Sequence, residues 1–111
     1  IVDKYNQSDL CGFTFTTDAF EGLFLLMKGT YSKEGWLLKN EQLPVLFLGG
    51  EKDPCIGNGR KFVQELQFLK AVGYQKVTGK RYPGMRHEIL NEKERCLVYK
   101  DISAFFTHIL S

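Results

Sequence analysis

Two side chains, 34 positions apart, are the strongest candidates for chemistry. Asp53 follows an apolar run that ends in two glycines, within "LPVLFLGGEKDPCIGNG", and His87 lies within "YPGMRHEILNE". A carboxylate that accepts a hydrogen bond from one imidazole nitrogen fixes the tautomer of the ring and leaves the other nitrogen free as a base. The two residue types therefore indicate a general-base pair, provided that the fold brings them together.

The elements around these residues predict a βαβ unit. Residues 43–50 contain four consecutive apolar side chains with no polar alternation, which is typical of a strand covered on both faces. A helical period follows over residues 62–72 and stops at Gly73. Residues 76–83 predict a second strand, which leads into a Tyr-Pro-Gly turn. A strand, a helix and a strand in this order indicate a parallel sheet and an α/β fold.

Two further helices are expected, one on each side of this unit. Asp18 and Glu21 have the spacing of a capping box, before a helix that carries four apolar residues on one face and ends at Gly29. Asn91 and Glu94 have the same spacing and are expected to open the last helix, whose apolar stripe is Val98, Ile102, Phe105, Phe106 and Ile109. Residues 13–16 suggest a short extended piece, and residues 30–42 suggest a connection.

The parallel arrangement explains why Asp53 and His87 should meet. Both residues follow the carboxyl end of a predicted strand, and in a parallel sheet these ends lie at one edge. Neighbouring strands lie about 4.8 Å apart, so side chains from the two following loops are within reach of each other. Each residue alone also has a plain interpretation, Asp53 as a turn residue and His87 as a surface or structural histidine.

Other polar residues near the pair allow competing interpretations. Cys55 is two positions from Asp53, so a Cys–His nucleophilic pair or an Asp/Cys/His metal site is conceivable, although scattered ligands fall short of a closed zinc pattern. We favour a Cys55 side chain packed beneath the acidic loop. Glu88, next to His87, has two interpretations: it adjusts the pKa of His87 or, as we favour, it pairs with a nearby Lys or Arg or caps the following turn. His108 is expected to face solvent near the end of the last helix.

The composition excludes several classes of protein. The 111 residues are 43% hydrophobic and 25% charged, as in a globular domain, and a net charge of +2 is too small to indicate a nucleic-acid partner. No apolar run approaches the roughly 20 residues of a membrane span. The three cysteines, Cys11, Cys55 and Cys96, are odd in number and widely spaced, so we expect free thiols and a cytoplasmic location.

The two motifs resemble the C-terminal half of α/β-hydrolases of the serine aminopeptidase / monoacylglycerol lipase-like (lysophospholipase) group. In that group a Gly-Glu-x-Asp-Pro stretch carries the triad acid and a later Tyr-Pro-Gly-x-x-His-Glu stretch carries the triad histidine. The resemblance covers residues 9–110, and "DLCGFTFT" looks like the return from a helical cap to the core. It implies that Asp53 is the triad acid, that His87 is the general base, and that no metal or organic cofactor is required.

The same resemblance implies a nucleophile that this sequence lacks. The family's serine stands in a Gly-x-Ser-x-Gly elbow upstream of the acid, and neither Ser8 nor Ser32 has glycines two residues away on both sides. The chain also begins at Ile1 rather than Met. We therefore expect a C-terminal fragment of a larger enzyme, inactive by itself, that would act as a serine esterase on an acyl ester or lipid.

The expected organisation has two parts. Residues 1–30 would be the end of the cap segment and the return to the core, and residues 31–111 would be the C-terminal part of the α/β-hydrolase core. The missing N-terminal half, or another copy of the chain, would serve as partner. A non-catalytic binding or assembly module that keeps the hydrolase-like end is the alternative, because the apolar strand at 44–48 would then need a cover from self-association.

Overall fold

The computed structural model describes residues 2–111, and the chain divides into two compact units between Trp36 and Leu37. Each unit is described by itself. The first unit contains helices α1 (Val2–Asn6) and α2 (Thr17–Thr30). The second unit contains, in chain order, β1 (Val45–Gly50), α3 (Gly59–Val72), β2 (Val77–Tyr82), the short 3-10 helix η1 (Ile89–Asn91) and α4 (Arg95–Leu110).

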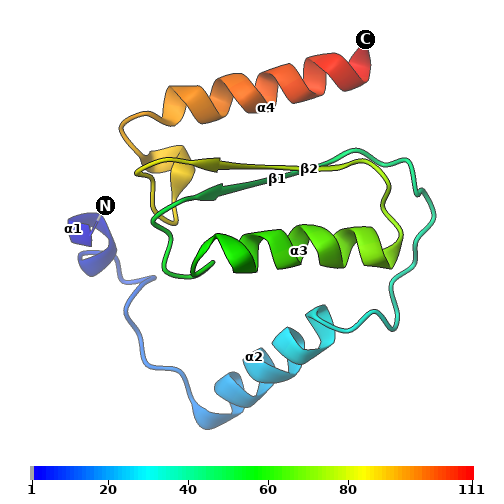
Figure 1. Ribbon diagram of the computed structural model, residues 1–111. Helices are drawn as coiled ribbons and strands as arrows, with labels where there is room; N and C mark the ends of the chain where they lie inside the picture. Colours follow the sequence, from blue (N-terminus) through cyan, green and yellow to red (C-terminus); the bar gives the residue numbers. More distant parts are fainter. Residues whose placement is uncertain (1) are drawn as a thin grey trace. The chain divides into compact units, whose positions relative to one another are not determined.

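Strands β1 and β2 form a parallel pair, as the sequence predicts. Their register runs from Val45 opposite Val77 to Gly50 opposite Tyr82. Helix α3 connects the two strands, so the predicted βαβ unit is confirmed. The carboxyl ends of both strands consequently lie at the same edge, where the chain continues into two loops (Figure 1).

Both faces of β1 are covered within the second unit. The ring of Phe47 packs against the ring of Phe62 on α3, with their centroids 5.2 Å apart. The neighbouring Leu48 points the other way, because successive side chains of a strand alternate, and it packs on the core cluster that contains Val98 of α4. Figure 1 shows α3 and α4 on opposite sides of the strand pair. The unbroken apolar run of β1 is explained by this double cover.

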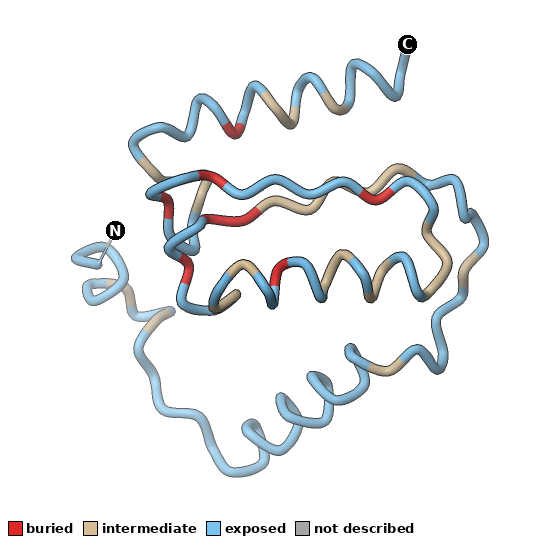
Figure 2. The backbone as a smooth tube through the Cα atoms, viewed as in Figure 1, coloured by how far each residue is buried: buried red, intermediate tan, exposed pale blue. Residues whose placement is uncertain are grey.

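The buried residues belong to the second unit and concentrate where β2 ends (Figure 2). Tyr82, Met85 and Val98 form a buried cluster, and Val98 is fully enclosed. This cluster joins the end of β2, the following loop and α4. The loop that carries His87 therefore starts from a well-packed base rather than from an exposed strand end.

Helix α3 begins and ends at residues that suit the helix termini. The side-chain oxygen of Asn58 accepts a hydrogen bond from the backbone N–H of Arg60, at 3.2 Å, and caps the amino end. At the other end Gly73 has φ of 130°, a backbone conformation that residues with a side chain rarely adopt. The predicted stop at Gly73 is thus confirmed.

The predicted start of α2 is wrong by two residues. The helix begins at Thr17, and the hydroxyl of Thr16 accepts a hydrogen bond from the backbone N–H of Ala19, at 3.2 Å. Thr16 can cap because its backbone is extended, whereas Asp18 already lies in the first turn. The helix runs through Gly29 to Thr30, and residues 13–16 form no strand.

The predicted capping box of the last helix is also wrong. Asn91 ends the 3-10 helix η1, and its side-chain amide donates to the carboxylate of Glu88, at 2.9 Å. Helix α4 starts only at Arg95, and Glu94 precedes it without a side-chain capping bond. The apolar stripe is partly confirmed, since Val98 is buried and Ile102 packs on the core, whereas Phe106 is exposed.

Helix α2 presents its apolar residues without burying any of them in this chain. The rings of Phe13, Phe15, Phe20 and Phe24 lie next to one another in that order, with neighbouring ring centroids 5.3–6.3 Å apart. None of the described helices has the length and apolar character that crossing a bilayer requires.

Candidate active site

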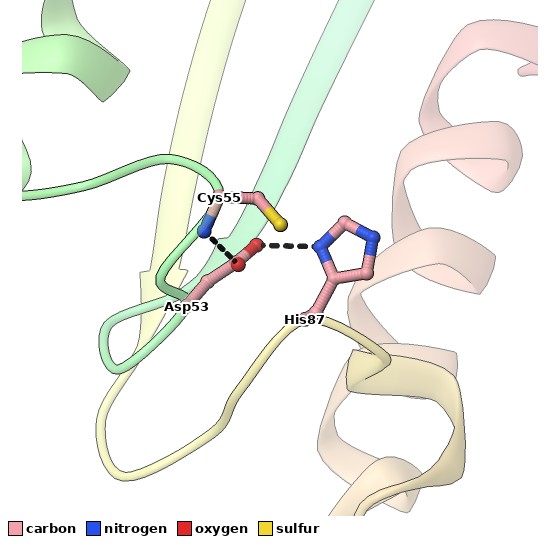
Figure 3. Close-up of side chains that lie close together, drawn as sticks. All are labelled: Asp53, Cys55 and His87. Carbon is pink, nitrogen blue, oxygen red and sulfur yellow. Dashed lines mark hydrogen bonds and ion pairs between the residues drawn. The ribbon is translucent and has the colours of Figure 1, made fainter.

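Asp53 and His87 lie in direct contact at the carboxyl edge of the strand pair (Figure 3). The Nδ1 atom of His87 is 2.9 Å from Oδ2 of Asp53, within hydrogen-bond distance. Asp53 is only 4% exposed, whereas the His87 side chain is 66% exposed. The predicted proximity of the two residues is confirmed, and the pair has one buried member and one accessible member.

The loop after β1 is held against the loop after β2 by backbone hydrogen bonds. The N–H of Glu51 donates to the carbonyl of Tyr82 at 3.0 Å, and the N–H of Lys52 donates to the carbonyl of Met85 at 2.9 Å. A third bond, from the N–H of Asp53 to the carbonyl of Gly50, closes a tight turn. These bonds continue the parallel pairing past the strand ends and fix where Asp53 emerges.

Gly50 explains why the apolar run ends in glycine. A methyl group at this position would lie 2.1 Å from the carbonyl oxygen of Arg86 and 2.4 Å from that of Met85. No side chain fits there, because both obstacles are backbone atoms. The loop that carries His87 therefore passes directly over the end of β1, and the absence of a side chain at Gly50 permits this approach.

A turn and a carboxylate position the histidine loop. Gly84 has φ of 75°, and the N–H of Met85 bonds to the carbonyl of Tyr82, as the predicted turn requires. Next to His87, the N–H of Arg86 donates to Oε1 of Glu92 at 2.8 Å. The sequence analysis missed Glu92, whose contact spans six positions and follows no helical or capping pattern.

The environment of Asp53 favours its ionised form. Burial disfavours the charge, but the hydrogen bond with His87 and the bond from the Cys55 backbone N–H together hold the pKa of Asp53 below its usual value. The Cys55 N–H donates to Oδ1 at 2.8 Å, so each carboxylate oxygen has a partner. Asp53 is thus a buried anion that faces the imidazole.

The pKa of the His87 imidazole is shifted in the opposite direction. Its hydrogen bond with Asp53 and the charge of Asp53 raise the pKa of His87 above the usual value, and the nearby charge of Glu88 adds to this. Glu88 thus acts on His87 in the way that we did not favour, and its carboxylate accepts a bond from the Asn91 side chain without capping η1. The protonated imidazolium is stabilised, which is what a base needs once it has taken a proton.

Cys55 lies beside the pair but does not pack beneath the loop, so that prediction is wrong. The residue is exposed, and its backbone N–H donates to the Asp53 carboxylate. One ligand-type atom each of Asp53, Cys55 and His87 lie within 4.8 Å of one another. All three cysteines are free thiols, as predicted.

The remaining candidate residues belong to other parts of the chain. Ser8 and Ser32 belong to the first unit, where each hydroxyl accepts a local bond, from the N–H of Leu10 and of Glu34 respectively. Such bonds are typical of turn serines. His108 is an exposed residue of α4, as predicted.

Geometry of this kind can orient an imidazole for proton transfer. With Nδ1 bonded to Asp53, the other nitrogen, Nε2, points away from the carboxylate in Figure 3. A reacting group that approached Nε2 would meet a base whose tautomer and ring orientation are already fixed. The catalytic role of either residue stays a prediction.

Comparison with known proteins agrees with the motifs and the fold. The Hydrolase_4 family model, described as serine aminopeptidase, S33, matches residues 1–94. This range includes the whole βαβ unit, Asp53 and His87. No curated protein matches the sequence. Because the match covers most of the chain, the protein belongs to the serine aminopeptidase S33 family of α/β-hydrolases.

Proposed function

We propose that this chain supplies the acid and the general base of a serine hydrolase that cleaves carboxylic esters, lipid esters among them. The observation that carries the proposal is the 2.9 Å contact between Nδ1 of His87 and the buried carboxylate of Asp53. The pKa of Asp53 is lowered and that of His87 is raised, as expected for an ion pair that forms during acyl transfer. Membership of a hydrolase family supports the same conclusion.

In this reaction Nε2 of His87 takes the proton of a serine hydroxyl while the oxygen attacks the ester carbonyl. Asp53 remains ionised and stabilises the imidazolium that results. The imidazolium then gives its proton to the departing alcohol, and water repeats the cycle on the acyl-enzyme. The exposure of His87 leaves Nε2 accessible to a serine from outside the second unit.

The nucleophile is proposed to come from a segment outside these 111 residues. None of the serines in the sequence has the Gly-x-Ser-x-Gly pattern, and the family order places the serine before the acid. In this proposal residues 31–111 are the C-terminal part of the hydrolase core, and residues 1–30 end the cap. An N-terminal half, or another copy of the chain, would complete the site, and the isolated chain would be inactive.

The decisive test uses the protein that carries the elbow serine and replaces His87 by alanine. We expect the turnover of a p-nitrophenyl ester to fall by about 10³-fold or more, because no other group can take the serine proton. His108→Ala is the matched control, because it removes the other histidine, exposed on α4. An unchanged rate in His87→Ala would eliminate the proposed role.

The same assay distinguishes an esterase from a peptidase, and a hydrolase from a non-catalytic module. Faster turnover of an amino-acid p-nitroanilide than of the ester would favour the peptidase activity in the family's name over the proposed esterase. The 111-residue chain alone should show neither turnover nor labelling by a fluorophosphonate probe. If the serine-bearing protein also fails to label, the non-catalytic assembly module becomes the better explanation.

A further inference from the structure

We propose that Asp53, Cys55 and His87 form a binding site for a thiophilic divalent cation, most of all zinc. The bound cation would prevent His87 from acting as a base. Carboxylate, thiolate and imidazole are all established zinc ligands. In the described residues these three groups gather within 4.8 Å, and their side chains converge in Figure 3. The inference depends on the proposed function only for its inhibitory consequence.

The Asp53 and His87 ligand atoms are spaced nearly as two ligand atoms of a tetrahedral zinc centre are. Zinc–nitrogen and zinc–oxygen bonds of about 2.1 Å place tetrahedral ligand atoms about 3.4 Å apart. Oδ2 of Asp53 and Nδ1 of His87 are 2.9 Å apart, so they must separate by about 0.5 Å. His87 and Cys55 are both exposed and lie in loops, so their side chains can make this adjustment while the buried Asp53 stays in place.

Cys55 is held near the pair by its own backbone. Its N–H donates to Oδ1 of Asp53 at 2.8 Å, which leaves Oδ2 facing the imidazole. In Figure 3 the Cys55 sulfur lies on the side of the Asp53 carboxylate that faces the imidazole. The sulfur is therefore directed to the same carboxylate as the imidazole, and a water molecule would occupy the fourth position of the cation.

Metal binding at Nδ1 has a defined consequence for the base. Neutral imidazole carries one proton, which in the catalytic arrangement lies on Nδ1 and leaves Nε2 unprotonated. A cation on Nδ1 needs that lone pair, so the ring proton moves to Nε2, where it blocks uptake of the serine proton. The thiol loses its proton to water, so one proton is released for each cation bound, and no oxidation or reduction occurs.

Direct binding is tested on the intact chain with Co²⁺, a spectroscopic substitute for zinc that accepts tetrahedral sulfur and nitrogen ligands. A phosphine reductant keeps the thiols reduced. We expect one cobalt per chain with a cobalt–thiolate charge-transfer band, and we expect Zn²⁺ to displace it. Cys55→Ser should abolish the band, and His87→Gln should weaken binding at least tenfold. The matched controls Cys96→Ser and His108→Gln should leave both unchanged.

Several results would overturn the inference. They are the absence of the band at saturating Co²⁺, its persistence in Cys55→Ser, or its equal loss in Cys96→Ser. Circular dichroism checks that each variant is folded. Cys55→Ser and His87→Gln each remove a different ligand, so if one of them fails to fold, the other still tests the site. Since this assay contains no substrate, its result stands even if the proposed hydrolase function fails.

Inhibition is then measured on the serine-bearing protein. Zn²⁺ should lower ester turnover, a chelator should restore it, and Cys55→Ser should need at least tenfold more Zn²⁺ for half inhibition, relative to its own metal-free rate. Equal sensitivity of Cys55→Ser and the parent protein would contradict the switch, because the inhibition would then arise from another site.

Discussion

Nδ1 of His87 lies 2.9 Å from Oδ2 of Asp53, although the two residues are 34 positions apart and belong to different loops. The parallel register of β1 and β2 places both loops at one edge, and Gly50 allows the histidine loop to cross the end of β1. The contact is thus a product of the βαβ topology and of one position without a side chain.

Replacing Asp53 by asparagine should reduce catalysis without removing the fold. An asparagine that turns its amide N–H₂ toward Nδ1 would favour the tautomer with the proton on Nε2, which cannot act as the base. We expect kcat for ester hydrolysis in the serine-bearing protein to fall by about 10³–10⁴-fold, with little change in KM. The exposed Asp9→Asn in the first unit is the control. A drop of less than about tenfold would contradict the assignment of Asp53 as the triad acid.

The titration of His87 should reveal its partner. Because Asp53 raises the pKa of His87, the imidazole should titrate above the ordinary value of about 6.5, as followed by NMR of the ring nitrogens. Asp53→Asn should return the pKa of His87 toward that value. The resonances of His108 in the same spectra report any general structural change. An identical His87 titration in both proteins would show that the contact is absent in solution.

The same shift predicts the pH dependence of activity and of stability. Activity requires neutral His87, so kcat/KM should rise with pH through the raised pKa of the free enzyme. The contribution of the charged pair to stability changes with pH in the opposite direction. It is fully present below the unfolded-state pKa of histidine, about 6.5, and is lost as the pH rises through the folded-state pKa. A stability that increased over this range would contradict the proposed pair.

The sequence predicted the βαβ unit because its signals are local and strong. The apolar run before Gly50, the helical period that ends at Gly73 and the Pro83-Gly84 turn each restrict the backbone directly. The contact between Asp53 and His87 followed from topology, since parallel strands align their carboxyl ends. These predictions did not need side-chain detail.

The predictions that failed depended on such detail. Asp18 has capping-box spacing, but Thr16 caps α2, because capping requires an extended backbone and not only a residue type. The exposure of Cys55 and the bond from the Arg86 N–H to the Glu92 carboxylate depend on how the two loops fold against each other. No pattern along the chain encodes these contacts.

Gly50→Ala should disturb the site through the backbone. The added methyl group would lie 2.1 Å from the Arg86 carbonyl oxygen, so the histidine loop must move. We expect a loss of about 1–3 kcal/mol in the free energy of unfolding, measured by urea denaturation, and a lower pKa for His87 as the contact lengthens. The control is Gly22→Ala on α2, where an added methyl group meets nothing within 4 Å. Equal stability of Gly50→Ala and the parent chain would show that the loops are not in close contact.

Tyr82→Phe should weaken the attachment of α4 to the end of β2. The buried ring of Tyr82 packs against Met85 and Val98, and its hydroxyl donates to Oδ2 of Asp101 at 2.6 Å, an oxygen that also accepts from Lys80. Phenylalanine keeps the ring and removes only the hydroxyl. Because Asp101 is partly exposed and retains Lys80, we expect a loss of only about 1 kcal/mol in the free energy of unfolding.

The matched control and the alkaline pH range make this prediction specific. The hydroxyl of Tyr99 donates to the Leu90 carbonyl at 3.0 Å on a half-exposed ring, so Tyr99→Phe should cost less. Burial, together with the bond to Asp101, raises the pKa of Tyr82, so the folded chain retains this proton at a pH where an unfolded tyrosine, with a pKa near 10, has lost it. Stability should therefore fall as the pH rises above about 10, and part of that fall should disappear in Tyr82→Phe. If both variants lost stability equally, the bond between Tyr82 and Asp101 would have no special role in holding α4 against the loop that carries His87.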